Sequence, residues 1–486
     1  MLRRCLPLLV LCGLAACSTD AGVTARRSEA GVDPTDSQPV PTQPTTPQTA
    51  PIDDPNRDGV GDVLFPELGN PGIDVTHYGV AIAYDPATDV IDGAVTIDLE
   101  LTEDRDAITL DAQGPEVTEV VVNGTTTTFL MDDPELRIDL PDKGRSGDSL
   151  QVVVRYGLHP YPQPSAIGMN NGWYNSPGGS YVLNEPDGAR TWLPCNDHPS
   201  DKAAYTFTIT VPAGLTAVAN GALGDHRTEG DHEVWVWEET QPMATYLIQV
   251  LTGDYEVVEG TGPHGLELLS VVLRSDLAAM QPALDTMSPQ IEFFEQFFGP
   301  YPFDRYGIAM TDSFGGLAME TQGRSLFSRD DFGFGVQQML LSHELAHQWF
   351  GDAVTPARWQ DIWLNEAFAT YGHMMWLEHI GEQTVGAAAA EALMFRSFGA
   401  TGTPGAAEMF GYNSYEGGAV VLHALRLQIG DDAFFTLLQR WVAENNGASR
   451  TTQDFIALAE DVAGERLSAF FDEWLFAGRT PTQFPR

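Results

Sequence analysis

Two histidines stand at a spacing that suits one metal ion. His343 and His347 begin and end the pattern His-Glu-x-x-His, and residues i and i+4 of a helix lie on the same face. A catalytic zinc ion takes three protein ligands and leaves a position for water. Eighteen residues separate His347 from Glu366, which we expect to be the third ligand. The pattern therefore predicts a site for one zinc ion.

Glu344, between the two histidines, has the chemistry of a general base. Zinc lowers the pKa of a bound water towards about 7, and a neighbouring carboxylate can take its proton. The hydroxide then attacks a carbonyl group that zinc polarises, and Glu344 can give the proton to the leaving amine. This chemistry needs no covalent intermediate. We expect Asn365 to hold a ligating histidine by accepting its second N–H.

The residues around this site have a helical pattern, whereas the residues ahead of them have a β pattern. Alternating apolar residues between about 66 and 258, as in Gly93–Leu101 and Ala204–Val211, predict antiparallel strands. After 258 the apolar spacing becomes helical. We therefore expect an α+β fold, with an antiparallel β domain followed by a mostly helical catalytic domain. The expected helices cover residues 335–351, 358–380, 383–397, 413–428, 432–445, 452–463 and 466–476.

The N-terminus is typical of an exported bacterial lipoprotein. Two arginines precede a short apolar run, and Leu14-Ala15-Ala16-Cys17 resembles the lipobox, in which the cysteine is acylated. We expect a signal peptide over 1–16, a lipid on Cys17 and a disordered Pro/Thr-rich linker over 17–61. The β domain then covers 62–258 and the catalytic domain 259–486. This predicts an anchor in the cell envelope, at the outer membrane or cell surface; an ordinary signal peptide is the alternative.

The charge of the chain excludes some classes of partner. Lys and Arg total 25 against 68 Asp and Glu, for a formal net charge of -43. Binding of nucleic acid needs a basic face, so we expect no nucleic acid as a partner. Contact with a membrane is expected through the lipid anchor only. Cys195 has no cysteine left to pair with in the mature chain, so we expect a buried thiol and no internal disulfide.

Several motifs together resemble the M1 family of zinc aminopeptidases. His343, His347 and Glu366 match the family's zinc motif, and Glu366 stands in the sequence Asn-Glu-Ala-Phe-Ala. Residues 315–322 resemble its GAMEN loop, Tyr415-Glu416-Gly417-Gly418 its YEKG segment, and residues 185–199 a segment of its N-terminal domain. The resemblance runs from about Asp74 to the end of the sequence. It implies a saddle-like β domain and a thermolysin-like catalytic domain, in a short form without the helical C-terminal domain.

The resemblance also implies roles for individual residues in binding peptides with a free N-terminus. Glu320 would bind the α-ammonium group of the substrate, with help from Glu185, and Tyr415 would donate a hydrogen bond to the tetrahedral oxyanion. The backbone that lines the peptide would be Gly316, Leu317, Ala318 and Met319.

Three positions depart from the family's motifs. Leu317 stands for a glycine and Thr321 for the asparagine of GAMEN, and these two positions bear on the preference for substrate side chains. Gly417 stands for the lysine of YEKG, so any role of that cation is absent. Without the C-terminal domain we expect a more open cleft that admits longer peptides.

The main hypothesis is an envelope-anchored aminopeptidase. An endopeptidase or dipeptidyl-peptidase with an open cleft is the first alternative, and a catalytically silent peptide-binding module is the second. Epoxide hydrolysis, as in leukotriene A4 hydrolase, stays open. His373 and His379 follow Glu366 on one helix, and packing or surface roles are expected for both.

Overall fold

One large twisted sheet dominates the first half of the described chain. The computed structural model describes residues 59–132, 134–165, 167–312, 318–333, 335–396, 398–479 and 481–485. Eight strands pair side by side in this sheet, and β1 alternates buried and exposed residues, as the β pattern predicts. In sheet order they are β14 (Ala222–Glu229), β15 (His232–Ala244), β12 (Lys202–Pro212), β1 (Ile73–Asp85), β2 (Val90–Leu101), β8 (Ser149–Leu158), β4 (Glu116–Val122) and β5 (Thr125–Thr126).

The expectation of a purely antiparallel sheet needs one correction. β1 and β12 run parallel, with Tyr78 opposite Tyr205, whereas the other pairs of this sheet are antiparallel. Two smaller sheets complete the β domain. The first contains β13 (Thr216–Ala219), β16 (Val250–Gly253), β11 (Gly179–Leu183), β10 (Asn170–Ser176) and β9 (Gln163–Pro164); the second contains β3 (Arg105–Asp111), β7 (Glu135–Gly144) and β6 (Phe129–Asp132).

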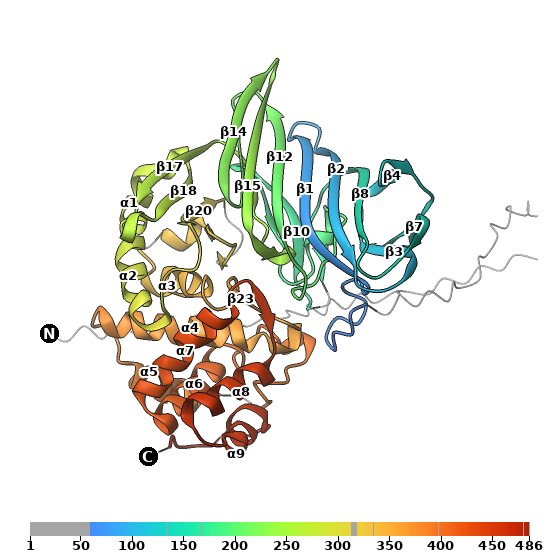
Figure 1. Cartoon of the computed structure of the whole chain (residues 1–486). Helices are drawn as coiled ribbons and strands as arrows, with labels where there is room; N and C mark the ends of the chain where they lie inside the picture. The colour runs from blue at the N-terminus through green and yellow to red at the C-terminus, as the bar shows by residue number, and fades with distance from the viewer. Residues whose placement is uncertain are drawn as a thin grey trace, which may run out of the picture. The chain divides into compact units, whose positions relative to one another are not determined.

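The second half is mostly helical, as predicted. Figure 1 shows these helices, coloured yellow to red, gathered beside the strands coloured blue to green. Each expected helical segment contains a helix, and residues 277–298 form two more. They are α1 (Leu277–Leu284), α2 (Met287–Phe298), α3 (Gln338–His347), α4 (Trp363–His379), α5 (Val385–Phe395), α6 (Glu416–Ile429), α7 (Asp431–Asn445), α8 (Thr452–Ala463) and α9 (Ser468–Phe471).

A further sheet lies among these helices, and most of it was missed by the helical pattern. It is mixed: β18 pairs parallel with β20, and β20 with β22, while β17 and β21 run antiparallel to their neighbours. Its strands are β17 (Tyr255–Thr261), β18 (Glu267–Leu273), β19 (Arg305–Tyr306), β20 (Ile308–Thr311), β21 (Ala318–Met319) and β22 (Ser325–Ser328). A short parallel pair, β23 (Val354–Pro356) with β24 (Ala448–Arg450), follows α3 and α7.

Two cations, one half-buried and one buried, join the β domain to the helical half. Nζ of Lys202, on β12, donates to the carbonyl oxygens of Asp352 (2.7 Å) and Ala353 (3.4 Å), just after α3. Arg324 donates to carbonyl oxygens of both halves, those of Ala219 and Leu269, each at 2.9 Å. The described residues accordingly form one compact unit. The boundary predicted at 258 stays a prediction.

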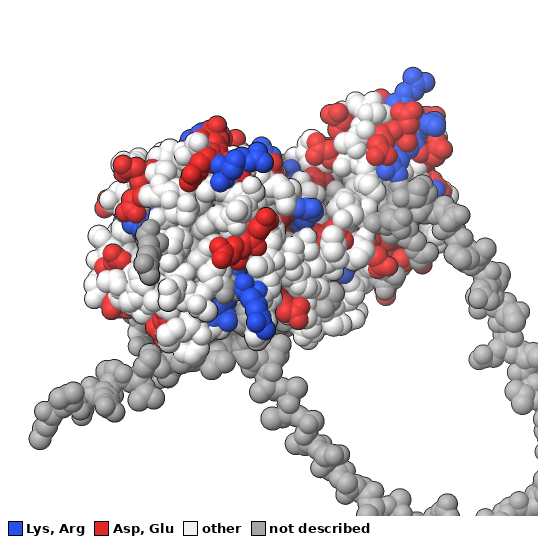
Figure 2. All heavy atoms as spheres, turned by 90° about the horizontal axis from the view of Figure 1, so that it is seen from below, with Lys and Arg blue, Asp and Glu red and all other residues white. Residues whose placement is uncertain are grey.

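Some predicted features lie outside the described residues. They are the signal peptide, Cys17, the linker up to residue 58, and Gly316 and Leu317 of the loop at 313–317. Among the helices of the described chain, none is long and apolar enough to cross a membrane. Figure 2 shows one face of the molecule, where acidic side chains form several separate groups and basic side chains form no continuous patch among the described residues.

Candidate metal centre

Helices α3 and α4 bring the three predicted ligands together. His343 and His347 occupy the last two turns of α3, and Glu366 lies in the first turn of α4, which packs against α3. Nε2 of His343 and Nε2 of His347 are 3.1 Å apart, and each lies 3.4 Å from Oε2 of Glu366. All three side chains are largely withdrawn from solvent. Three possible ligand atoms therefore surround one position.

The size of this triangle fits zinc. Four ligand atoms at tetrahedral corners, 2.0–2.1 Å from a central ion, lie about 3.3 Å from one another. The measured separations of 3.1 and 3.4 Å bracket that value. Oε2 of Glu366 is buried without a hydrogen-bond partner, which is costly for a carboxylate unless a cation meets it. Two imidazoles and a carboxylate are also a donor set that zinc prefers.

Hydrogen bonding fixes which nitrogen of His347 is free for a metal. Nδ1 of His347 lies 3.1 Å from the carbonyl oxygen of Phe350. A carbonyl oxygen only accepts, so Nδ1 carries a hydrogen, and in the neutral ring that binds a metal Nε2 keeps its lone pair. Glu320, Glu344 and His347 form a second group of possible ligands, but Nδ1 of His347 is the atom nearest Glu320, at 3.9 Å. The first triad is therefore the better metal site.

The structure places the acceptor for His347 differently from the sequence expectation. Asn365, predicted to hold a ligating histidine, instead donates from its amide to the hydroxyl of Tyr246 at 3.1 Å. The backbone of Phe350 takes the expected role. The signal for this was absent from the side-chain pattern, because a carbonyl oxygen is available at every residue.

Glu344 lies in the same buried space as the triad. Its Oε2 has no hydrogen-bond partner, and only 5% of the residue is exposed. Burial, with the charges of Glu320 and Glu366, raises the pKa of Glu344 well above its usual range. Burial alone would also raise the pKa of Glu366, but the two histidines outweigh it and lower that pKa to about 2.

The negative charge of this space calls for a cation. Burial lowers the pKa of His347, yet Glu320 and Glu366 more than reverse that effect and raise it well above its usual range. The carboxylates thus favour a positive charge at His347, which a bound proton supplies in the metal-free chain. A divalent ion would supply it directly.

Two further carboxylates close one side of the site. Glu320 follows β21 and is 3% exposed, and Glu185 follows β11 and is half-buried. One oxygen of each lies within 4.8 Å of an oxygen of Glu366. Oε1 of Glu185 and Oε1 of Glu320 are buried without hydrogen-bond partners. These atoms are available to a donor that enters from outside the chain.

The remaining predicted residues either lie beside the triad or point away from it. Tyr415, just before α6, stacks its ring on His343 with 6.0 Å between centroids. Ala318 and Met319 form β21, immediately before Glu320. Thr321 points elsewhere: its hydroxyl bonds to the Gln249 amide and to the carbonyl oxygen of Arg324. This departure from the family motif therefore serves the packing between the two halves.

His373 is a contact that the sequence analysis missed. Its Nδ1 lies 3.2 Å from Nδ1 of His343, although packing or surface exposure was expected. Burial lowers the pKa of His373 well below its usual range. A signal existed: His373 follows Glu366 by seven residues, two helical turns along the same face.

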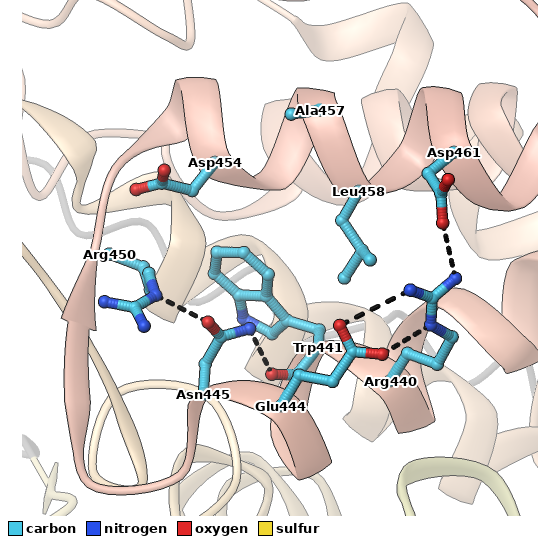
Figure 3. A pocket seen from close by; sticks show the side chains of 9 residues that line it. All are labelled: Arg440, Trp441, Glu444, Asn445, Arg450, Asp454, Ala457, Leu458 and Asp461. Atoms are coloured by element: carbon cyan, nitrogen blue, oxygen red, sulfur yellow. Dashed lines mark hydrogen bonds and ion pairs between the residues drawn. The ribbon is translucent and has the colours of Figure 1, made fainter.

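A surface groove elsewhere on the molecule is lined by none of the predicted site residues. Helices α7 and α8 line it, and its volume is about 350 Å³ (Figure 3). Arg440 pairs there with Glu444 at 2.6 Å and with Asp461 at 2.8 Å. Its charged side chains thus largely satisfy one another, so we place the chemistry at the buried triad.

Two models of one peptidase family match the chain. The model of the peptidase M1 N-terminal domain matches residues 75–247, and that of the peptidase family M1 domain matches residues 282–474. The second range contains the triad, Glu320 and Tyr415, and the first contains Glu185.

Relatives of the chain carry aminopeptidase names. Probable aminopeptidase 2 of Sulfurisphaera tokodaii is 27% identical over 408 residues, which are 77% of this chain and 50% of that protein. Leucyl aminopeptidase of Saccharolobus solfataricus is 29% identical over 289 residues, or 56% of this chain and 35% of that protein. The chain thus spans half or less of the length of these two relatives.

A solved structure matches over nearly its whole length. The M1 zinc metallopeptidase of Deinococcus radiodurans is 31% identical, with a TM-score of 0.81, covering 88% of this chain and 99% of that one. A mutant of that enzyme has been solved with a Tyr-Ser-Ala substrate, and it matches with a TM-score of 0.82 and 30% identity, over 88% of this chain and 99% of that one.

Proposed function

This chain belongs to peptidase family M1, and from that membership we propose that it is a zinc-dependent aminopeptidase that removes N-terminal residues from peptides. The observation that carries the proposal is the pair Glu320 and Glu185 beside the triad, with unpartnered buried oxygens. A carboxylate pair at one end of a site favours a substrate with a cationic end. We infer that this pair also stops the peptide chain from extending past that end, as removal of terminal residues requires.

Each residue has a separate task in the proposed reaction. His343, His347 and Glu366 hold one zinc ion, which when bound supplies an activated water and polarises the carbonyl of the scissile bond. Glu344 accepts the proton of the attacking water and passes it to the leaving amine. Tyr415 donates a hydrogen bond to the oxygen that becomes negative during attack. Glu320 and Glu185 accept hydrogen bonds from the α-ammonium group.

A panel of matched substrates tests this function. Aminoacyl-aminocoumarins with free amines and the same compounds with N-acetyl groups differ only in the group that Glu320 would bind. We expect turnover of the free amines and little of the acetylated forms. Equal cleavage of both would reject an aminopeptidase in favour of an endopeptidase. Zinc binding without turnover of any peptide would favour a silent peptide-binding module.

We also propose that the chain is exported and anchored to the cell envelope by a lipid on Cys17. The support is the lipobox-like sequence and the preceding apolar run. Expression of the full sequence with a labelled fatty acid should label the wild-type chain and not Cys17→Ala, and only the former should sediment with membranes. Membrane association of Cys17→Ala equal to that of wild type would exclude this anchor.

A further inference from the structure

His373 contacts a predicted metal ligand from the middle of α4. Its Nδ1 and Nδ1 of His343 are 3.2 Å apart, a distance at which one nitrogen donates a hydrogen bond to the other. The two rings are 5.5 Å apart between centroids and tilted by 42°. Since Glu366 lies two turns earlier on α4, one helix supplies both a ligand and a partner for another ligand.

The direction of this hydrogen bond follows from where His343 faces. Nε2 of His343 is the atom that lies 3.1 Å from Nε2 of His347 and 3.4 Å from the Glu366 carboxylate. A metal takes the lone pair of that nitrogen, so the ring hydrogen of a neutral His343 must be on Nδ1. Nδ1 of His373 is then the acceptor.

We propose that His373 is a positioning residue of the zinc site, whose imidazole accepts the Nδ1 hydrogen of His343 and so holds Nε2 of His343 towards the ion. The inference rests on the proposed zinc site. In this arrangement both ligating histidines donate their Nδ1 hydrogen to an uncharged acceptor. For His347 that acceptor is the carbonyl oxygen of Phe350. Such partners fix the tautomer and the orientation of the ring.

The uncharged partner also suits its surroundings. Ligating histidines often donate the N–H of the ring nitrogen that does not bind the metal to a carboxylate, which makes the ligand more basic. Here Glu185, Glu320 and Glu344 already lie beside the triad, which itself contains Glu366. An imidazole provides the acceptor without adding a fifth carboxyl group to this buried cluster.

Zinc affinity of the full chain tests the role. We would remove the metal, then measure the zinc dissociation constant by competition with a chromogenic chelator. His373→Leu removes the acceptor and should raise the dissociation constant about 10–100-fold. His373→Gln keeps an acceptor, its amide oxygen, and should restore much of the affinity. His379→Leu, on the same helix but exposed, is the control and should bind zinc like wild type.

Unfolding of the metal-free chain separates positioning from packing. A packing role would lower the free energy of unfolding of the metal-free His373→Leu chain and leave zinc affinity unchanged, and that result would overturn the proposal. So would a His373→Gln chain that binds zinc as weakly as His373→Leu. If the wild-type chain took up no zinc, the metal site itself would fail, and the role of His373 with it. If wild type bound zinc and His373→Leu bound it with the same dissociation constant, only the positioning role of His373 would be rejected.

Discussion

Single atoms decide the chemistry of this site. Nε2 of each histidine faces Oε2 of Glu366, while each Nδ1 has its own partner. The spacing of the ligands could be predicted from the sequence because it depends on the period of one helix and on a nearby second helix. The partners on Nδ1 could not, because Phe350 acts through its backbone and His373 through a contact between two helices.

Replacing the proposed base should stop turnover and keep the metal. In Glu344→Gln the amide cannot accept the proton of the attacking water, and we expect kcat to fall about 10²–10⁴-fold. Glu344 is not one of the three ligands, so the zinc content should stay at one ion per chain. Steady-state kinetics and metal analysis on the same preparation measure both. Loss of zinc in this variant would show that Glu344 helps to hold the metal.

Replacing Glu320 should affect the recognition of the free amine. Glu320→Gln keeps the shape of the side chain and removes its charge, at a loss of about 1.5–3 kcal/mol for a charged hydrogen bond. That corresponds to a decrease in kcat/KM of about 10–100-fold for free-amine substrates. N-acetylated substrates should change little. A Glu320→Gln enzyme that still discriminates between the two as wild type does would contradict this assignment.

At the scale of elements, long periodic segments were predictable and short buried strands were not. Helices α3 to α8 match segments predicted from apolar residues at helical spacing, and none extends more than one residue beyond its segment. Strands β20 and β22 have four residues each, all buried, so they lack the alternation that marks a half-exposed strand. The parallel pairing of β1 with β12 was also hidden, because strand direction depends on the path of the chain between them.

The contact of Lys202 between elements should depend on pH. Burial lowers the pKa of Lys202 to about 7, despite the opposing charge of Asp352, whereas an unfolded lysine has a pKa of about 10.4. Between these two values the unfolded chain binds a proton that the folded chain does not, so the contribution of Lys202 to stability rises with pH.

Comparison with Lys202→Met isolates that contribution. The variant removes one of the two donors to each carbonyl oxygen of Asp352 and Ala353, and we expect a loss of about 0.5–1.5 kcal/mol at alkaline pH and a smaller loss near pH 7. Denaturant unfolding at several pH values measures it. Lys143→Met, at an exposed site, is the control and should show no such trend. A loss for Lys202→Met that is constant between pH 7 and 10 would contradict the depressed pKa.

At the scale of the whole molecule, the excess of acidic residues sets the response to salt. A formal net charge of -43 makes the folded chain repel itself. The screening length falls from about 10 Å at 0.1 M salt to about 3 Å at 1 M. We therefore expect the melting temperature to rise by a few °C over this range, equally in sodium and potassium chloride. A melting temperature that falls would mean that attractive ion pairs outweigh the repulsion.

The scarcity of lysine also makes the molecule convenient to label. The sequence has two lysines, and Nζ of Lys202 is occupied by carbonyl oxygens in the interior, while Lys143 is exposed on β7. An amine-reactive dye should therefore attach to a single side chain of the folded protein, far along the sequence from every residue of the metal site. A second dye would enter only when Lys202 leaves its place, so the stoichiometry of labelling would report separation of the two halves of the molecule.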